Sequence, residues 1–156
     1  MSTIETPSEF RAAFDTLLAD TSRLLRIYDR DLSMFDIDLA PRHAALRALC
    51  VAGGGRRIEL LLDDISSVAR THPRLMRLVR DFSHVLEIRQ ADSDAPRPEQ
   101  AFVLADHRGV LVRVDKAAIP GILNLNDPGR ANLLNQSFEG MWQRSPASVS
   151  ASTSGL

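Results

Sequence analysis

A pair of adjacent apolar runs in the last third of this chain constrains its fold more than any other feature. The segments FVLA and VLVRV flank Asp106-His107-Arg108-Gly109, a polar sequence that ends in glycine. Short runs rich in β-branched residues, separated by a turn sequence, are typical of a β-hairpin. The chain therefore has to build a sheet in which these two strands are neighbours.

Before the hairpin, short apolar runs alternate with segments of helical periodicity. Strands are predicted at Leu24–Tyr28, Ile58–Leu62 and Val85–Arg89. The second of these is apolar along almost its whole length, which favours a central strand covered on both faces. Helices are predicted from Asp38 or Ala40 up to the triple glycine 53–55, and from Ile65 to about Phe82 with a break at His72-Pro73.

Helix start signals stand near both ends of the domain. Thr6-Pro7-Ser8-Glu9 is a capping box with proline at the first helical position, and Asp127-Pro128 begins a final helix in the same way. The apolar face of the final helix is predicted to hold Ala131, Leu134, Phe138, Met141 and Trp142. Residues 91–100 and 115–126 are expected to be irregular.

Together these elements predict an α/β fold, a mixed sheet with helices on both faces in the order β-α-β-α-β-β-β-α, preceded by an extra helix. We expect residues 1–22 to form that helix, 23–145 the α/β domain and 146–156 a disordered tail. A flavodoxin-like doubly wound sheet is the alternative. Two consecutive strands after Arg89, in place of another strand–helix–strand unit, argue against it.

From about Leu24 to Ser145 the chain resembles one half of a phospholipase D-like domain. The hairpin, the following helix and its end, Phe138-x-x-x-Trp142-x-x-Ser145, carry the resemblance. The segments LRIYDRDL, RIELLLDD and HPRL are similar to a group of uncharacterised bacterial domains that is often fused behind an acetyltransferase-type domain. The resemblance implies a bacterial origin, pairing of half-length chains as a homodimer, and a possible acetyltransferase partner.

In that superfamily the strand before the turn carries a His-x-Lys-x4-Asp motif. The histidine is the nucleophile that becomes phosphorylated, and the lysine neutralises phosphate oxygens. Aligning Asp106 with the motif aspartate places Glu99 at the histidine and Ala101 at the lysine. The Gly-Ser-x-Asn segment that follows in the superfamily is replaced by Val112-Arg113-Val114-Asp115.

These replacements predict no catalytic residues, and so a chain that is not an enzyme. We expect a non-catalytic phospholipase D-like module that binds a ligand or a partner. Two alternatives stay open at this point. One is an enzyme-associated domain that supports an acetyltransferase or acts on a small phosphorylated metabolite. The other is nucleic-acid binding.

Polar residues follow several of the predicted strands. In open α/β sheets, ligands bind beyond the carboxyl ends of the strands. The candidate ligand-binding residues are Asp29, Arg30, Asp31, Asp63, Asp64, Glu99, Asp106 and His107. Such carboxylates could hold Mg²⁺ or Ca²⁺, but helix capping and pairing with arginine explain them without a metal, with Asp64 placed to cap a helix at Ile65. No metal and no cofactor are predicted.

Arginines recur at spacings of 4, 3 and 3 at Arg70, Arg74, Arg77 and Arg80. A basic stripe of this kind could lie along a nucleic-acid backbone. A solvated helix face is favoured instead, because the net charge of −1 supplies no attractive field for a polyanion. Nucleic acid is therefore not an expected partner.

The sequence has no apolar run long enough to span a membrane, and its first residues lack the basic and apolar regions of a signal peptide. Its single cysteine, Cys50, allows no internal disulfide and sits in an apolar helical pattern. We therefore expect a cytoplasmic protein without membrane contact.

Overall fold

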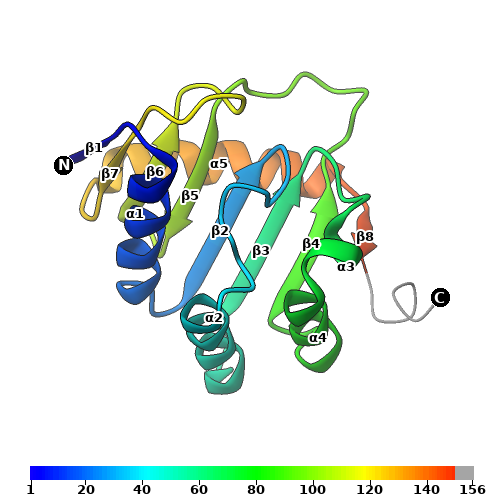
Figure 1. Ribbon diagram of the computed structural model, residues 1–156. Helices are drawn as coiled ribbons and strands as arrows, with labels where there is room; N and C mark the ends of the chain where they lie inside the picture. The colour runs from blue at the N-terminus through cyan, green and yellow to red at the C-terminus, as the bar shows by residue number, and fades with distance from the viewer. Residues whose placement is uncertain (150–156) are drawn as a thin grey trace.

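A computed structural model describes residues 1–149, which form a mixed sheet of eight strands with helices on both faces (Figure 1). The strand order is β1-β7-β6-β5-β2-β3-β4-β8. Strands β2, β3 and β4 are parallel to one another, and every other pairing is antiparallel. The predicted mixed α/β fold is confirmed. The strands are β1 Ser2–Ile4, β2 Leu24–Asp29, β3 Arg57–Leu62, β4 Leu86–Gln90, β5 Ala101–Ala105, β6 Gly109–Arg113, β7 Gly121–Asn124 and β8 Ala147–Val149.

The helices divide between the two faces of the sheet. Helix α5 (Pro128–Arg144) crosses one face, and α1 (Pro7–Ala19), α2 (Ala40–Ala52) and α4 (Pro73–Asp81) cover the other (Figure 1). A one-turn helix, α3 (Val68–Thr71), precedes α4. Two apolar clusters follow from this arrangement. Ile58, Leu60 and Leu62 of β3 belong to the cluster under α1, α2 and α4, whereas Leu61 belongs to the cluster under α5. The prediction of a strand covered on both faces is confirmed.

Helix caps form where the sequence indicates them. The Thr6 side chain accepts a hydrogen bond from the Glu9 N–H at 3.1 Å, and Asp127 accepts one from the Arg130 N–H at 3.1 Å. Gly53 ends α2 with a φ of 53°, a conformation that glycine adopts without a Cβ clash. All five residues of the predicted apolar face of α5 are buried.

Three strands lie where none was predicted, and β1 and β7 are the first two of them. Residues 115–126 are not irregular throughout, because β7 pairs with β6 and, on its other side, with β1. Strand β1 lies within residues 1–22, for which only a helix was predicted. Both strands are too short to show a clear alternation, so only their pairing reveals them. A Cβ atom at Gly121 would collide with the carbonyl oxygen of Val112, so the β6–β7 approach requires glycine there.

The helical segment predicted from Ile65 differs in its start. Helix α3 begins at Val68, and Asp64 caps a turn instead of a helix, since its carboxylate accepts the Ser66 N–H at 2.9 Å. The break before Pro73 is confirmed.

The tail was predicted to be disordered from residue 146. Residues 147–149 instead form β8, which pairs antiparallel with β4. The rest of the tail, 150–156, lies outside the described residues.

Candidate functional site

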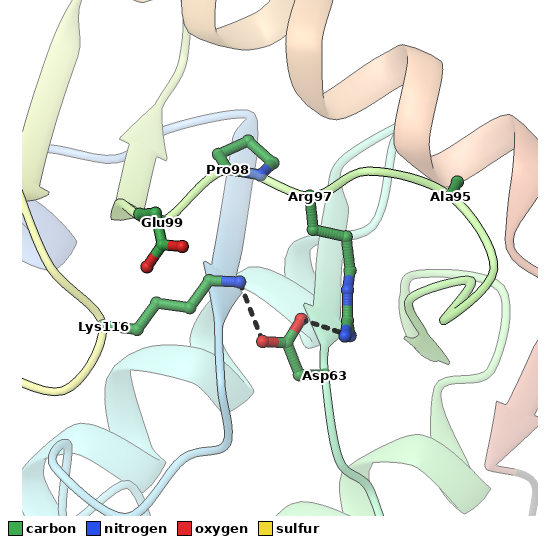
Figure 2. Close-up of a pocket in the computed structure, with 6 residues that line it drawn as sticks. All are labelled: Asp63, Ala95, Arg97, Pro98, Glu99 and Lys116. Atoms are coloured by element: carbon green, nitrogen blue, oxygen red, sulfur yellow. Dashed lines mark hydrogen bonds and ion pairs between the residues drawn. The ribbon is translucent and has the colours of Figure 1, made fainter.

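A polar pocket of about 350 Å³ opens at the carboxyl ends of β2 and β3 (Figure 2). One wall is the segment 91–100 between β4 and β5, and another is the segment 114–120 between β6 and β7. The pocket is lined by Asp63, Ala95, Arg97, Pro98, Glu99 and Lys116. It therefore lies where ligands bind in sheets of this type.

Asp63, the first residue after β3, joins the two loops of the pocket. The Lys116 Nζ donates a hydrogen bond to Asp63 Oδ2 at 2.8 Å. The Arg97 Nη1 lies 3.0 Å from Asp63 Oδ1, at ion-pair distance but without hydrogen-bond alignment. One carboxylate thus neutralises a cation from each loop (Figure 2).

Tyr28, near the end of β2, supports the floor of this arrangement. Its hydroxyl accepts a hydrogen bond from Lys116 Nζ at 2.6 Å and donates one to the Pro98 carbonyl at 3.4 Å. Burial raises the pKa of Tyr28, and the negative charge of Asp63 raises it further. The phenol therefore stays protonated at neutral pH and can hold both contacts at once.

An ion pair between Asp29 and Arg113 lies at the same end of the sheet. Their side chains are 5% and 1% exposed. The Arg113 guanidinium also donates to the carbonyls of Lys116 and Ala118, each at 2.9 Å. Burial raises the pKa of Asp29, and the positive charge of Arg113 opposes that rise. Arg113 thereby fixes the start of the 114–120 loop that carries Lys116.

Glu99 differs from the other charged residues of the pocket. Its carboxylate is exposed and makes no hydrogen bond or ion pair with residues 1–149. Its carbonyl accepts the Lys116 N–H at 2.9 Å, which ties the two loops together. Ala101 begins β5 and is buried, so it places no charge in the pocket.

Arg30, Asp31 and Asp64, all predicted to be near this site, do not line the pocket. The Asp31 carboxylate accepts both the N–H and the hydroxyl of Ser33, at 3.0 and 2.6 Å. Arg30 lies 3.9 Å from Asp31 and is half exposed. Of the predicted residues, the structure therefore brings together Asp63 and Glu99, with Asp29 at the same end of the sheet.

The placement of Asp106 and His107 at this site was wrong. Strand β5 is antiparallel to β2, so its carboxyl end lies beside the amino end of β2. There the Asp106 carboxylate accepts the backbone N–H groups of Ser22, Arg23 and Leu24 at 3.2, 2.8 and 3.1 Å. Asp106 thus anchors the start of β2 and takes no part in the pocket.

The carboxylates of the described residues do not gather around a common point. Within residues 1–149, no three His, Cys, Asp or Glu side chains form a group that could hold a metal ion. The contacts above explain why, because Asp29, Asp31, Asp63 and Asp64 are each held by a cation or by neighbouring N–H and O–H donors.

The arginine stripe is divided between two helices, since Arg70 belongs to α3 and the other three to α4. Arg74 donates to the Asp38 carbonyl at 3.1 Å, and Arg80 pairs with Asp81 at 3.1 Å. The stripe is therefore not one continuous row of free cations.

Sequence reasoning missed Tyr28, Arg97, Arg113 and Lys116. One signal was available, because Arg113 interrupts an otherwise apolar strand and must find a partner if it is buried. The other contacts join residues far apart in the sequence, such as Lys116 and Asp63, and no local pattern indicates them.

Residues 6–151 match the sequence profile of a family described as a domain of unknown function, DUF7931. The chain belongs to this family. No curated protein matches the sequence. Because the family has no assigned activity, membership alone names no ligand or reaction.

Solved structures share the fold. Nuc of Salmonella typhimurium, a phospholipase D family member, is 14% identical with a TM-score of 0.66, over 96% of this chain and 99% of that one. NucT of Helicobacter pylori is 13% identical with a TM-score of 0.61, over 94% and 98%. TrmBL2, an archaeal chromatin protein that binds DNA, is 10% identical with a TM-score of 0.67, and this chain spans 54% of its length. At these identities the likeness shows the fold alone, which is phospholipase D-like.

None of the helices in residues 1–149 is long and apolar enough to cross a membrane.

Proposed function

We propose that this DUF7931 chain is a non-catalytic phospholipase D-like binding module whose ligand site is the pocket at the carboxyl ends of β2 and β3. The observation that carries the proposal is the side chain that enters the pocket where the resemblance places the catalytic histidine. That side chain is Glu99, and its neighbour at the motif lysine is the uncharged Ala101. A carboxylate is a weak nucleophile toward phosphate and repels an anionic substrate.

The cations of the site support the same proposal. A phosphoryl-transfer site needs positive charge that is free to meet the developing negative charge. Here Lys116 and Arg97 are both engaged by Asp63, and Arg113 is engaged by Asp29. Recruiting Arg113 to a phosphate would leave the buried Asp29 without its partner, which is costly. Recruiting Lys116 or Arg97 would take from Asp63 one of its two cations.

We further propose that the chain forms a homodimer through the carboxyl edge of its sheet, which is the end at which β2 and β3 finish. The sheet margins do not require a partner, because β1 and β8 are each three residues long and short edge strands resist pairing. The carboxyl edge carries the open pocket and Val114, a residue that directly follows β6 and is 74% exposed. A symmetric contact there would cover Val114 and bring two pockets together.

A screen of phosphodiester substrates tests the non-catalytic proposal. The purified full chain is incubated with bis-p-nitrophenyl phosphate and with phosphatidylcholine, with and without Mg²⁺ or Ca²⁺. We expect no product above the buffer rate in any condition. Turnover in any of these conditions would overturn the proposal if Glu99→Gln or Lys116→Met abolishes it.

A further inference from the structure

We propose that the pocket takes a small zwitterion of the amino-acid type, with its carboxylate toward Arg97 and its ammonium toward Glu99. This inference rests on the binding function proposed above and names the ligand class of the same site. It follows from the charge of the lining, from its unused hydrogen-bonding groups and from its size.

The charged residues of the lining balance. Asp63 and Glu99 are acidic, and Arg97 and Lys116 are basic, so their formal charges sum to zero. A simple anion in this pocket would face Glu99, and a simple cation would face Arg97 and Lys116. A ligand that carries one group of each sign is the electrostatic complement of such a lining.

Unused hydrogen-bonding capacity of both kinds remains in the pocket. The Glu99 carboxylate has no partner among residues 1–149, and the buried Asp63 Oδ1 has no aligned donor. An ammonium group offers donors to such acceptors. On the other side, the Lys116 ammonium uses two of its three protons. Arg97 carries five N–H donors, and its contact with Asp63 involves one nitrogen.

The positions of these groups make simultaneous binding possible. Figure 2 shows Glu99 and Arg97 on the same loop, separated by Pro98, with the Glu99 side chain directed toward Lys116 and the Arg97 side chain toward Asp63. The two ends of a short zwitterion can therefore meet opposite charges from one loop. The Pro98 carbonyl is held by Tyr28 and the Glu99 carbonyl by Lys116, which fixes that loop in place.

The size and polarity of the pocket limit the rest of the ligand. A volume of about 350 Å³ equals that of roughly twelve water molecules at ~30 Å³ each. That space is large enough for a single amino acid. The lining contains few apolar groups, with only Ala95 and Pro98 among its residues. A polar side chain is therefore favoured over an apolar one.

A chemical-shift titration of the ¹⁵N-labelled full chain tests the inference. The probes are L-glutamine, N-acetyl-L-glutamine, which lacks the cation, L-glutamine methyl ester, which lacks the anion, and inorganic phosphate. We expect L-glutamine to shift amides of the 91–100 and 114–120 segments and to bind at least about tenfold more tightly than either blocked analogue, since each loses one charge-assisted contact. Phosphate should not shift these amides.

Variants assign each charged contact to a residue. Glu99→Gln should remove the preference for L-glutamine over its N-acetyl form and leave the preference over the methyl ester. Arg97→Gln should do the reverse. Glu5 is exposed and does not line the pocket, so Glu5→Gln is the matched control and should leave both preferences intact.

The failures of the two proposals are distinguishable. If the blocked analogues bind as tightly as L-glutamine, or if no amino-acid probe shifts the pocket amides, the zwitterion class is wrong. If phosphate binds and Glu99→Gln tightens it, the pocket is an anion site and the class is again wrong. Neither result bears on catalysis, which the phosphodiester screen reports separately.

Discussion

Arg113 and Asp29 form an ion pair whose two side chains are almost completely buried, at the end of the sheet where the pocket opens. Removing one partner of such a pair leaves an uncompensated charge in a site that water does not reach. Substitutions in this pair therefore test how much the pair contributes to the stability of this end of the sheet.

We expect Arg113→Met to lower the free energy of unfolding by about 3–5 kcal/mol, as when a buried pair loses one member. Asp29→Leu should have a similar cost. The double variant should cost less than the sum of the single variants by at least ~1 kcal/mol, because no charge is then stranded. Urea unfolding of the four proteins gives the coupling energy. Strict additivity would show that the two residues do not depend on one another.

Trp142 and Phe138 lie one turn apart on α5 and are both buried. Their rings stack with 5.6 Å between the ring centroids. The Arg89 guanidinium lies 4.1 Å from the Trp142 ring centroid. Trp142→Ala should cost about 3–5 kcal/mol of stability, as for other large aromatic residues in cores. Leu133→Ala on the same helix is the control, since Leu133 is 67% exposed, and it should cost under ~0.5 kcal/mol. A cost below about 1 kcal/mol for Trp142→Ala would mean that α5 is not docked through this residue.

Asp106 should contribute stability that depends on pH. Burial alone would raise the pKa of Asp106, but the N–H donors of Arg23, Leu24 and Ser22 outweigh it, so the pKa lies below its usual value. A lowered folded-state pKa stabilises the protein above the unfolded pKa of about 3.9, and that contribution is lost as pH falls below it.

The variant Asp106→Asn tests this dependence, and asparagine tolerates the positive φ of 57° at this position. It should cost about 1–2 kcal/mol at pH 7, toward the low end for charged acceptors because the carboxylate is partly solvated. Urea unfolding at pH 7 and pH 3 should show the difference from the natural protein shrinking at the lower pH. A difference that is equal at both values would exclude a role for the carboxylate charge.

Sedimentation equilibrium at micromolar concentrations tests the proposed homodimer. We expect a mass of twice the 17.2 kDa chain. Val114→Asp should weaken association, because it places a charge at the proposed contact. Val51→Asp is the matched control, since Val51 is 56% exposed on the last turn of α2. A single-chain mass at every concentration would contradict the dimer, and so would equal effects of the two variants.

Local sequence signals predicted most of the fold. The caps at Thr6 and Asp127, the glycine at 53 and the apolar face of α5 each depend on neighbours in the chain, and each is confirmed. Strands β1 and β7 escaped prediction because three or four residues show no usable period and form only by pairing with each other and with β6.

The candidate site was predicted only in part, for a topological reason. Asp29 ends β2 and Asp63 follows the parallel strand β3, so the two lie at one end of the sheet, as expected. Asp106 follows an antiparallel strand, which carries it to the opposite end. The cations of the site come from loops, and Lys116 reaches Asp63 across 53 positions of the sequence. The order of strands in the sheet decides such contacts, and no local pattern encodes it.

The central proposal is that the pocket of this chain binds a ligand and does not hydrolyse phosphodiesters. The most direct measurement is the rate of p-nitrophenol release from bis-p-nitrophenyl phosphate by the natural chain, Glu99→Gln and the double variant Glu99→His with Ala101→Lys. We expect all three to match the buffer rate. The double variant restores the two motif residues, but Arg113 and Val114 still stand in the segment that replaces the supporting Gly-Ser-x-Asn sequence. Hydrolysis by the natural chain that Glu99→Gln abolishes would contradict the account.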